Sequence, residues 1–132
     1  MNLDVDLDAY FDSPPEKLWK ALTDPALLAR WLMPNDFEPR VGKRFTFVPD
    51  CPTSWEGNVA CEVLELIPPR RMVWSWLSKG MDLPSRVVFE LSPSGPGTLL
   101  RLRHMGETDD SVAKDLKGGW PGKVSAFKAL AI

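Results

Sequence analysis

The first residues of the chain alternate between apolar and acidic side chains. Aspartates separate the four apolar residues Leu3, Val5, Leu7 and Ala9. Successive side chains of a β-strand point to opposite faces of the sheet. This period of two therefore predicts a strand with one acidic, solvated face.

Two short helices are predicted directly after this strand. Ser13 is suited to cap the first helix, with Pro14 at its first position and Glu16 completing a capping box. Asp24 and Pro25 repeat the combination of cap and proline for a second helix. Apolar residues recur at helical spacing in both segments until a further proline stops the second one.

The middle of the chain has the pattern of antiparallel strands joined by tight turns. Strand-like segments rich in β-branched and aromatic residues occupy 44–48, 55–67, 72–76, 87–91 and 100–104. A proline pair separates the second segment from the third closely enough for a hairpin. The run 92–97, made of Ser, Pro and Gly, predicts a turn before the last strand.

The last part of the chain predicts an interrupted helix. From Ser111 onward the composition is helical, and one face carries the apolar residues Trp120, Val124, Phe127 and Ala131. Pro121 lacks a backbone donor and crowds the preceding turn, so we expect a kink or break near Trp120. The order of elements is that of an α+β protein, and no linker or repeat divides residues 1–132 into further domains.

The composition is that of an ordinary globular protein. Hydrophobic residues make up 44% of the 132 positions and charged residues 26%, which excludes a disordered tail, a collagen-like chain and a coiled coil. The net charge of −2 gives no overall attraction to nucleic acid or to an anionic membrane surface. The start lacks the pattern of a signal peptide, and no apolar stretch could cross a membrane. We therefore expect a cytoplasmic protein with no nucleic-acid partner and no membrane insertion.

Few of the residues that metal binding or nucleophilic catalysis needs are present. His104 is the only histidine, whereas a zinc site needs three or four closely spaced ligands. Cys51 and Cys61 are too few for a disulfide framework, and we expect both to be reduced thiols. The glycine-rich run 117–123 departs from a phosphate-binding loop at its first glycine and after its final lysine. We therefore expect no metal and no cofactor.

Three polar residues deserve separate interpretations because each could face the interior. His104 shares a strand face with Leu100 and Leu102, so it is either a neutral, hydrogen-bonded core residue or a polar group presented to a ligand. Glu62 and Glu65 lie on opposite faces of a regular strand, so one of them could point inward. A solvated or ion-paired carboxylate is the simpler interpretation than a catalytic one.

The aromatic residues are the largest apolar resource of the chain. Six tryptophans and six phenylalanines are present, and each removes some 150–250 Å² from water when fully buried. A plain core is the default explanation. So many bulky rings in a small protein are nevertheless hard to pack without voids, and aromatic walls are common in small-molecule clefts. A partly hollow core is therefore expected.

Several segments together resemble a known superfamily. They are residues 9–25, 28–31, 42–47, 63–76, 100–104 and 119–120, in order over nearly the whole chain. The sequence is similar to the START-like superfamily, also called SRPBCC, helix-grip or birch-pollen-allergen-like. Within it, the sequence most resembles the branch of activator-of-heat-shock-protein-90-ATPase homologues. The resemblance implies a curved antiparallel sheet of about six strands wrapped around the C-terminal helix, with a cavity between them.

By position, the resemblance also implies a set of cavity-wall residues: Trp31, Phe45, Phe47, Trp74, Trp76, Phe89, Leu102, His104, Trp120, Val124 and Phe127. Glu65 is the possible polar group of this cavity. The alternation of the strands independently gives Phe45 and Phe47 one common face, and Leu102 and His104 another. The superfamily hosts binders, cyclases, hydrolases and chaperone-linked proteins, so the fold alone does not fix the activity.

The favoured hypothesis is a non-enzymatic protein that binds an apolar, aromatic or lipid-like small molecule in this cavity. The first alternative is a cyclase- or hydrolase-like enzyme that uses the same cavity, with His104 and Glu65 or Glu62 as its polar groups. The second alternative is a co-regulator of a chaperone ATPase, which ranks lower because we expect no extra domain that could contact so large a partner. Both a monomer and a homodimer are compatible with the sequence.

Overall fold

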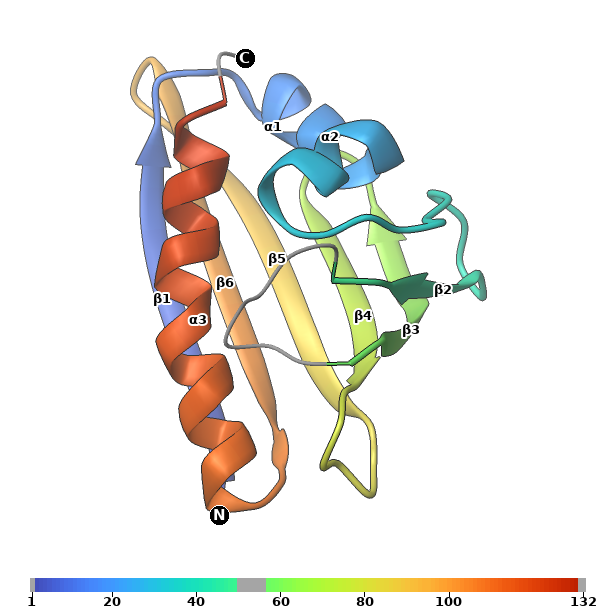
Figure 1. The fold of residues 1–132 in the computed structure, drawn as a ribbon. Helices are drawn as coiled ribbons and strands as arrows, with labels where there is room; N and C mark the ends of the chain where they lie inside the picture. The colour runs from blue at the N-terminus through green and yellow to red at the C-terminus, as the bar shows by residue number, and fades with distance from the viewer. Residues whose placement is uncertain (1, 50–56, 131–132) are drawn as a thin grey trace.

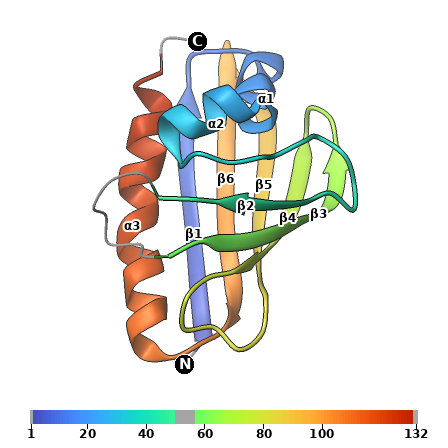
Figure 2. The same cartoon turned by 45° about the vertical axis from the view of Figure 1, so that its right-hand side comes forward.

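The computed structural model of the protein describes residues 2–49 and 57–130. An antiparallel sheet packs against one long helix, and two short helices lie together near one end of the sheet (Figure 1; Figure 2). In chain order the elements are β1 (Asn2–Phe11), α1 (Pro15–Thr23), α2 (Pro25–Trp31), β2 (Arg44–Phe47), β3 (Val59–Ile67), β4 (Arg71–Leu77), β5 (Ser85–Ser94), β6 (Gly97–Glu107) and α3 (Asp110–Lys128).

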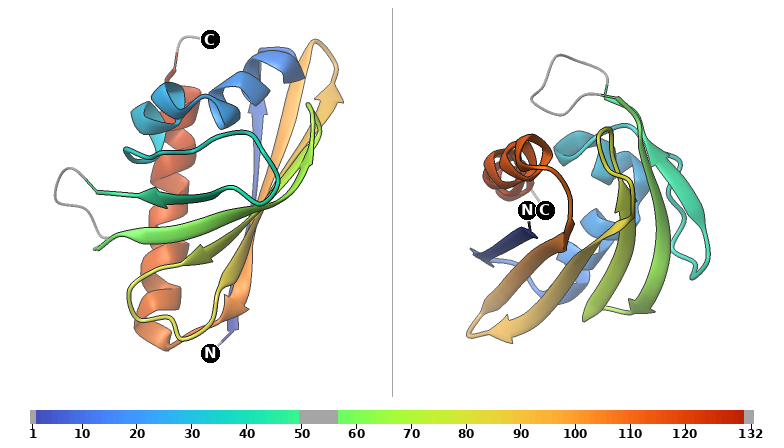
Figure 3. Two further views of the ribbon diagram at one scale, coloured as in Figure 1. Left: turned by 90° about the vertical axis from the view of Figure 1, so that its right-hand side faces the viewer. Right: turned by 90° about the horizontal axis from the view of Figure 1, so that it is seen from below.

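The sheet has six strands in the order β1-β6-β5-β4-β3-β2, and each pair of neighbours is antiparallel. Seen from below, the strands curve around α3 (Figure 3). The α+β class, the two short helices after the first strand and the grip of the sheet on the C-terminal helix are all confirmed. Residues 51–56, which include Cys51 and the start of one predicted strand, lie outside the described residues.

The predicted cap of α2 is confirmed, whereas that of α1 is wrong. The Asp24 side chain accepts a hydrogen bond from the Ala26 backbone N–H at 2.9 Å. At α1, Pro14 occupies the capping position and no side chain caps the helix, which begins at Pro15. A residue that precedes proline is driven to the extended region, so Pro14 cannot be the first helical residue. Ser13 instead accepts a hydrogen bond at its carbonyl from Thr98 Oγ1 at 2.7 Å.

A bulge in β3 resolves which of its residues face inward. The register shifts between Val63, which pairs with Trp74, and Glu65, which pairs with Val73. Leu64 is the extra residue, and a bulge of this kind reverses the alternation beyond it. A regular strand would place the two glutamates of β3 on opposite faces. The bulge places both on the outer face, so the expectation that one of them points inward is wrong.

The long helix α3 is continuous from Asp110 to Lys128 and contains Pro121 within it. The expected break near Trp120 is therefore wrong. Pro121 removes a donor that would otherwise bond the carbonyl of residue 117, and both Lys117 and Pro121 are exposed. Water can satisfy that carbonyl on the outer side of the helix, so the buried side stays intact. No helix of the described residues is long and apolar enough to span a membrane.

The hairpin of β5 and β6 is longer than its turn signal suggests. The predicted turn covers 92–97, but pairing continues to Ser94 and Gly97. Only Gly95 and Pro96 remain between the strands, and Gly95 has a φ of 58°. Gly97 lies so close to the Phe11 carbonyl that no side chain fits there. The tight turn therefore lets β6 run the full length of β1.

Candidate functional site

The residues expected to form a cavity wall are all buried between the sheet and the helices. They come from α2, β2, β4, β5, β6 and α3, so the fold brings together what the sequence separates. Their rings contact one another directly. Trp31 stacks on Phe127 with centroids 4.7 Å apart, and Trp74 meets Phe89 edge-on at 4.7 Å. At this level of the molecule these side chains form a packed aromatic core.

His104 lies at the centre of a hydrogen-bond chain that joins four elements. Trp120 Nε1 on α3 donates to His104 Nδ1 at 3.0 Å. Because an indole N–H can only donate, the imidazole proton sits on Nε2. That nitrogen lies 2.7 Å from Ser85 Oγ on β5, and the Ser85 hydroxyl donates to the Trp76 carbonyl on β4 at 2.8 Å. Every donor of this hydrogen-bond chain therefore has an acceptor, in the order Trp120, His104, Ser85 and the Trp76 carbonyl.

Burial also fixes the charge of this histidine. His104 has no exposed surface, and loss of hydration lowers its pKa from 6.5 to about 3. It is therefore a neutral imidazole with both nitrogens engaged. This matches the interpretation of a hydrogen-bonded core histidine. The sequence-based prediction that His104 points inward is confirmed.

The two glutamates of β3 lie on the solvated outer face. Glu65 Oε1 pairs with Arg71 at 3.1 Å, and Glu62 Oε1 pairs with Arg44 at 3.3 Å. Arg71 also contacts Glu90, which in turn contacts Arg103. The β3 bulge directs the Glu65 side chain to the outer face of the sheet, where it joins a row of ion pairs. Glu65 is thus not a cavity group.

Cys61 behaves as a buried apolar side chain. It is a free thiol that faces the interior, and burial raises the pKa of the thiol. A thiol of raised pKa is a poor nucleophile and a poor metal ligand near neutral pH. Within residues 2–49 and 57–130, no three His, Cys, Asp or Glu residues lie close enough together to hold a metal ion.

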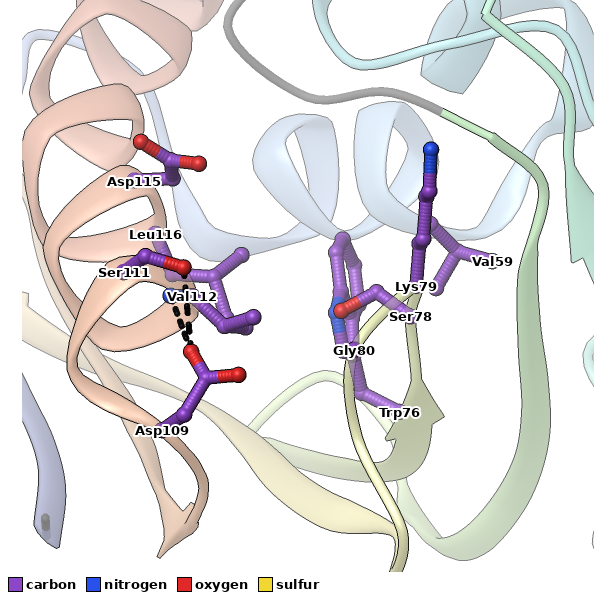
Figure 4. Close-up of a pocket in the computed structure, with 10 residues that line it drawn as sticks. All are labelled: Val59, Trp76, Ser78, Lys79, Gly80, Asp109, Ser111, Val112, Asp115 and Leu116. Atoms are coloured by element: carbon purple, nitrogen blue, oxygen red, sulfur yellow. Dashed lines mark hydrogen bonds between the residues drawn. The ribbon is translucent and has the colours of Figure 1, made fainter.

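A pocket of about 330 Å³ opens where the first turns of α3 face the ends of β3 and β4 (Figure 4). Its volume is in the range typical of small-molecule sites. The apolar part of its wall consists of Val59, Trp76, Val112 and Leu116. Trp76 also contacts His104 and Trp120, with centroids 5.2 and 5.6 Å away, so this wall is continuous with the aromatic core.

Polar groups form the rim of this pocket. Ser78, Lys79 and Gly80 contribute from one side, and Asp109, Ser111 and Asp115 contribute from α3 (Figure 4). Asp109 caps α3, because its Oδ1 accepts from the Val112 N–H at 2.9 Å and from Ser111 Oγ at 3.1 Å. These bonds, that from Val112 first, lower the pKa of the Asp109 carboxyl. The rim therefore carries an ionised carboxylate at neutral pH.

Of the residues expected around the cavity, Trp76 lines this pocket. Trp31 lines a second hollow of about 410 Å³ between α2 and α3, together with Lys123, whose Nζ donates to the Leu32 carbonyl at 3.0 Å. Most of the pocket residues were missed by the sequence-based prediction. Val112 and Leu116 could have been found, because they extend the apolar spacing of Trp120 and Val124 by two helical turns. The rim residues carried no such signal.

A curved antiparallel sheet that grips a long C-terminal helix, with a pocket at one end of that helix, defines the helix-grip class, a fold typical of ligand-binding domains. Within it, the sequence matches the family of Activator of Hsp90 ATPase homolog 1-like proteins over residues 12–131. The chain belongs to this family. No curated protein matches the sequence.

Solved structures show the same fold. Protein MLL2253 from Mesorhizobium loti has a TM-score of 0.84 at 37% identity, covering 95% of this chain and 93% of that one. CalU16 from Micromonospora echinospora has a TM-score of 0.76 at 29% identity, covering 96% and 76%. The Aha1 dimer from Colwellia psychrerythraea has a TM-score of 0.79 at 22% identity, covering 95% and 92%, which shows a shared fold alone.

Proposed function

We propose that the protein binds a small apolar or aromatic molecule in the pocket between α3 and the ends of β3 and β4. The observation that carries this proposal is the form of the pocket. Val112 is partly exposed in the pocket, and Leu116 and the Trp76 indole are buried behind it, so an apolar wall lies beneath a polar rim. Ligand pockets combine these two features, because apolar burial supplies affinity and a few polar groups orient the ligand.

The expected affinity follows from the area that such a ligand would bury. Apolar burial contributes about 25 cal/mol per Å². A two-ring aromatic molecule that loses roughly 200 Å² to the pocket would gain about 5 kcal/mol, equivalent to a Kd in the range of roughly 0.1–1 mM. Hydrogen bonds to the rim would tighten the binding further.

Binding is favoured over catalysis because the candidate catalytic side chains are engaged in hydrogen bonds or ion pairs outside the pocket. Both ring nitrogens of His104 are engaged within the core. Glu62 and Glu65 form ion pairs on the outer face of the sheet. General acid–base catalysis needs a titratable group within hydrogen-bond reach of the substrate, and neither the histidine nor the two glutamates line this pocket.

The proposal can be tested by NMR titration of the ¹⁵N-labelled protein with a panel of fatty acids and two-ring aromatic compounds. We expect at least one compound to shift the backbone amides of residues 78–80 and 109–116. A Val112→Phe variant, which fills the pocket, should abolish these shifts. A Val41→Phe variant places the same ring at an exposed site away from the pocket and should bind as the wild type does.

Two results would contradict the proposal. One is the absence of shifts in both segments with every compound of the panel. The other is binding that the Val112→Phe variant leaves unchanged while its fold, judged by the remaining amide spectrum, is retained.

A further inference from the structure

One wall of the pocket contains a hydroxyl group with no hydrogen-bond partner among the residues that the structure describes. Ser78 follows the end of β4, and its buried Oγ forms no hydrogen bond within residues 2–49 and 57–130. A serine hydroxyl can both donate and accept, and leaving such a group buried and unpaired is unfavourable. Ser78 is one of the residues that line the pocket, on the side of β4 (Figure 4). Ser78 is therefore suited to meet a polar group of a bound molecule.

The opposite wall contains an acceptor with unused capacity. Oδ1 of Asp109 takes part in both capping bonds, which leaves Oδ2 outside them. Oδ2 is directed toward Gly80, since a methyl group at that glycine would lie 3.9 Å from it. Figure 4 shows this carboxylate on the α3 side of the pocket and Ser78 on the side of β4. A donor and an acceptor thus flank the same apolar surface.

The rim carries charges of both signs, because Asp109, Asp115 and Lys79 all line the pocket. A charged ligand group would lose its hydration on entering the pocket, and this costs far more free energy than the transfer of a neutral hydroxyl. An uncharged hydroxyl can donate to a carboxylate and accept from a serine at the same time.

We propose that the ligand carries a neutral hydroxyl group on its aromatic body. This inference rests on the proposed function. The hydroxyl donates to Asp109 Oδ2 and accepts from Ser78 Oγ, while the ring lies against Val112 on the apolar wall of the pocket. Ser78 and Asp109 are then the residues that determine specificity at this site.

The test compares naphthalene with 2-naphthol, which differ by one hydroxyl group, in NMR titrations at pH 7. The wild-type protein should bind 2-naphthol roughly three- to tenfold more tightly than naphthalene. The preference should fall to about twofold or less in Ser78→Ala. It should also fall in Asp109→Asn, which keeps a capping residue at the start of α3. The control is Ser75→Ala, which removes a serine of β4 on the outer face of the sheet and should preserve the preference.

Charged analogues extend the test. 2-Naphthoate and a naphthylmethylammonium ion should both bind more weakly than 2-naphthol. If naphthalene binds in the pocket but 2-naphthol binds no better, the hydroxyl inference fails and the proposed function stands. A preference for 2-naphthol that survives in Ser78→Ala and Asp109→Asn also overturns the inference. If neither compound binds and the wider panel also fails, the proposed function fails with it.

Discussion

The buried histidine makes a quantitative prediction about acid stability. His104 is the only histidine of the chain, so few other groups titrate between pH 7 and 5. Its pKa is about 3 in the folded protein, compared with 6.5 for a solvent-exposed imidazole. As the pH falls below 6.5, the unfolded chain binds a proton that the folded protein does not bind. Folding is therefore progressively disfavoured down to about pH 3.

The size of this effect follows from linkage. Each pH unit well inside that window costs about 1.4 kcal/mol for one proton. From pH 7 to pH 5 the free energy of unfolding should fall by about 2 kcal/mol, since protonation is only partial near pH 6.5. Urea unfolding, followed by circular dichroism at half-unit intervals of pH, measures the loss directly.

A His104→Gln variant separates this effect from all other titrations. Glutamine cannot bind a proton here, so the variant should be less stable at pH 7 but should show little further loss down to pH 5. The imidazole resonances of the wild type provide an independent measurement, and they should stay in the neutral state to below pH 4.5. A histidine that titrates near pH 6.5 in the folded protein, or equal pH dependence in both proteins, would refute the reasoning.

Three further predictions concern stability and can be checked by urea unfolding. Trp120→Phe shrinks a buried ring and leaves an imidazole nitrogen without its donor, so it should cost about 2–4 kcal/mol; the same change at the partly exposed Trp19 should cost about 1 kcal/mol or less. Gly80→Ala adds a methyl group 2.6 Å from a side chain of α3 at a φ of 91°, and should cost about 2–3 kcal/mol. Gly42→Ala, with a similar φ but open surroundings, should cost only about 1 kcal/mol, and equal losses would contradict the steric argument. Pro121→Ala restores a helical hydrogen bond at an exposed position and should raise the free energy of unfolding by about 2 kcal/mol. A lower free energy of unfolding in this variant would mean that the proline ring makes stabilising contacts.

Much of the fold could be predicted because its signals are local. The alternation that begins at Leu3 and the apolar face that begins at Trp120 each reflect the geometry of a single element. The inward direction of His104 followed from the same alternation. Where local rules competed, the prediction failed. Pro15 restricted Pro14 and moved the start of α1, and the bulge after Val63 reversed the face of Glu65.

The candidate site was harder to predict because its parts are far apart in the sequence. Trp76 could be selected as an aromatic residue, but nothing near it indicated that its ring would meet α3. Ser78 and Asp109 look like ordinary residues of a loop and of a helix cap. Only the packing of α3 against the end of β4 gives them a common pocket.

The sequence by itself determined the class of the fold, the order of its elements and the inner faces of most strands, because hydrophobic periodicity is a property of neighbouring residues. The tertiary structure decided which buried side chains fill the interior and which line a pocket. It also decided that the single histidine is neutral, because the packing of the elements that carry Ser85 and Trp120 buries it completely. The volume of a pocket, the burial of a side chain and the hydrogen bonds between distant residues all depend on how the elements pack. No local sequence pattern encodes that packing.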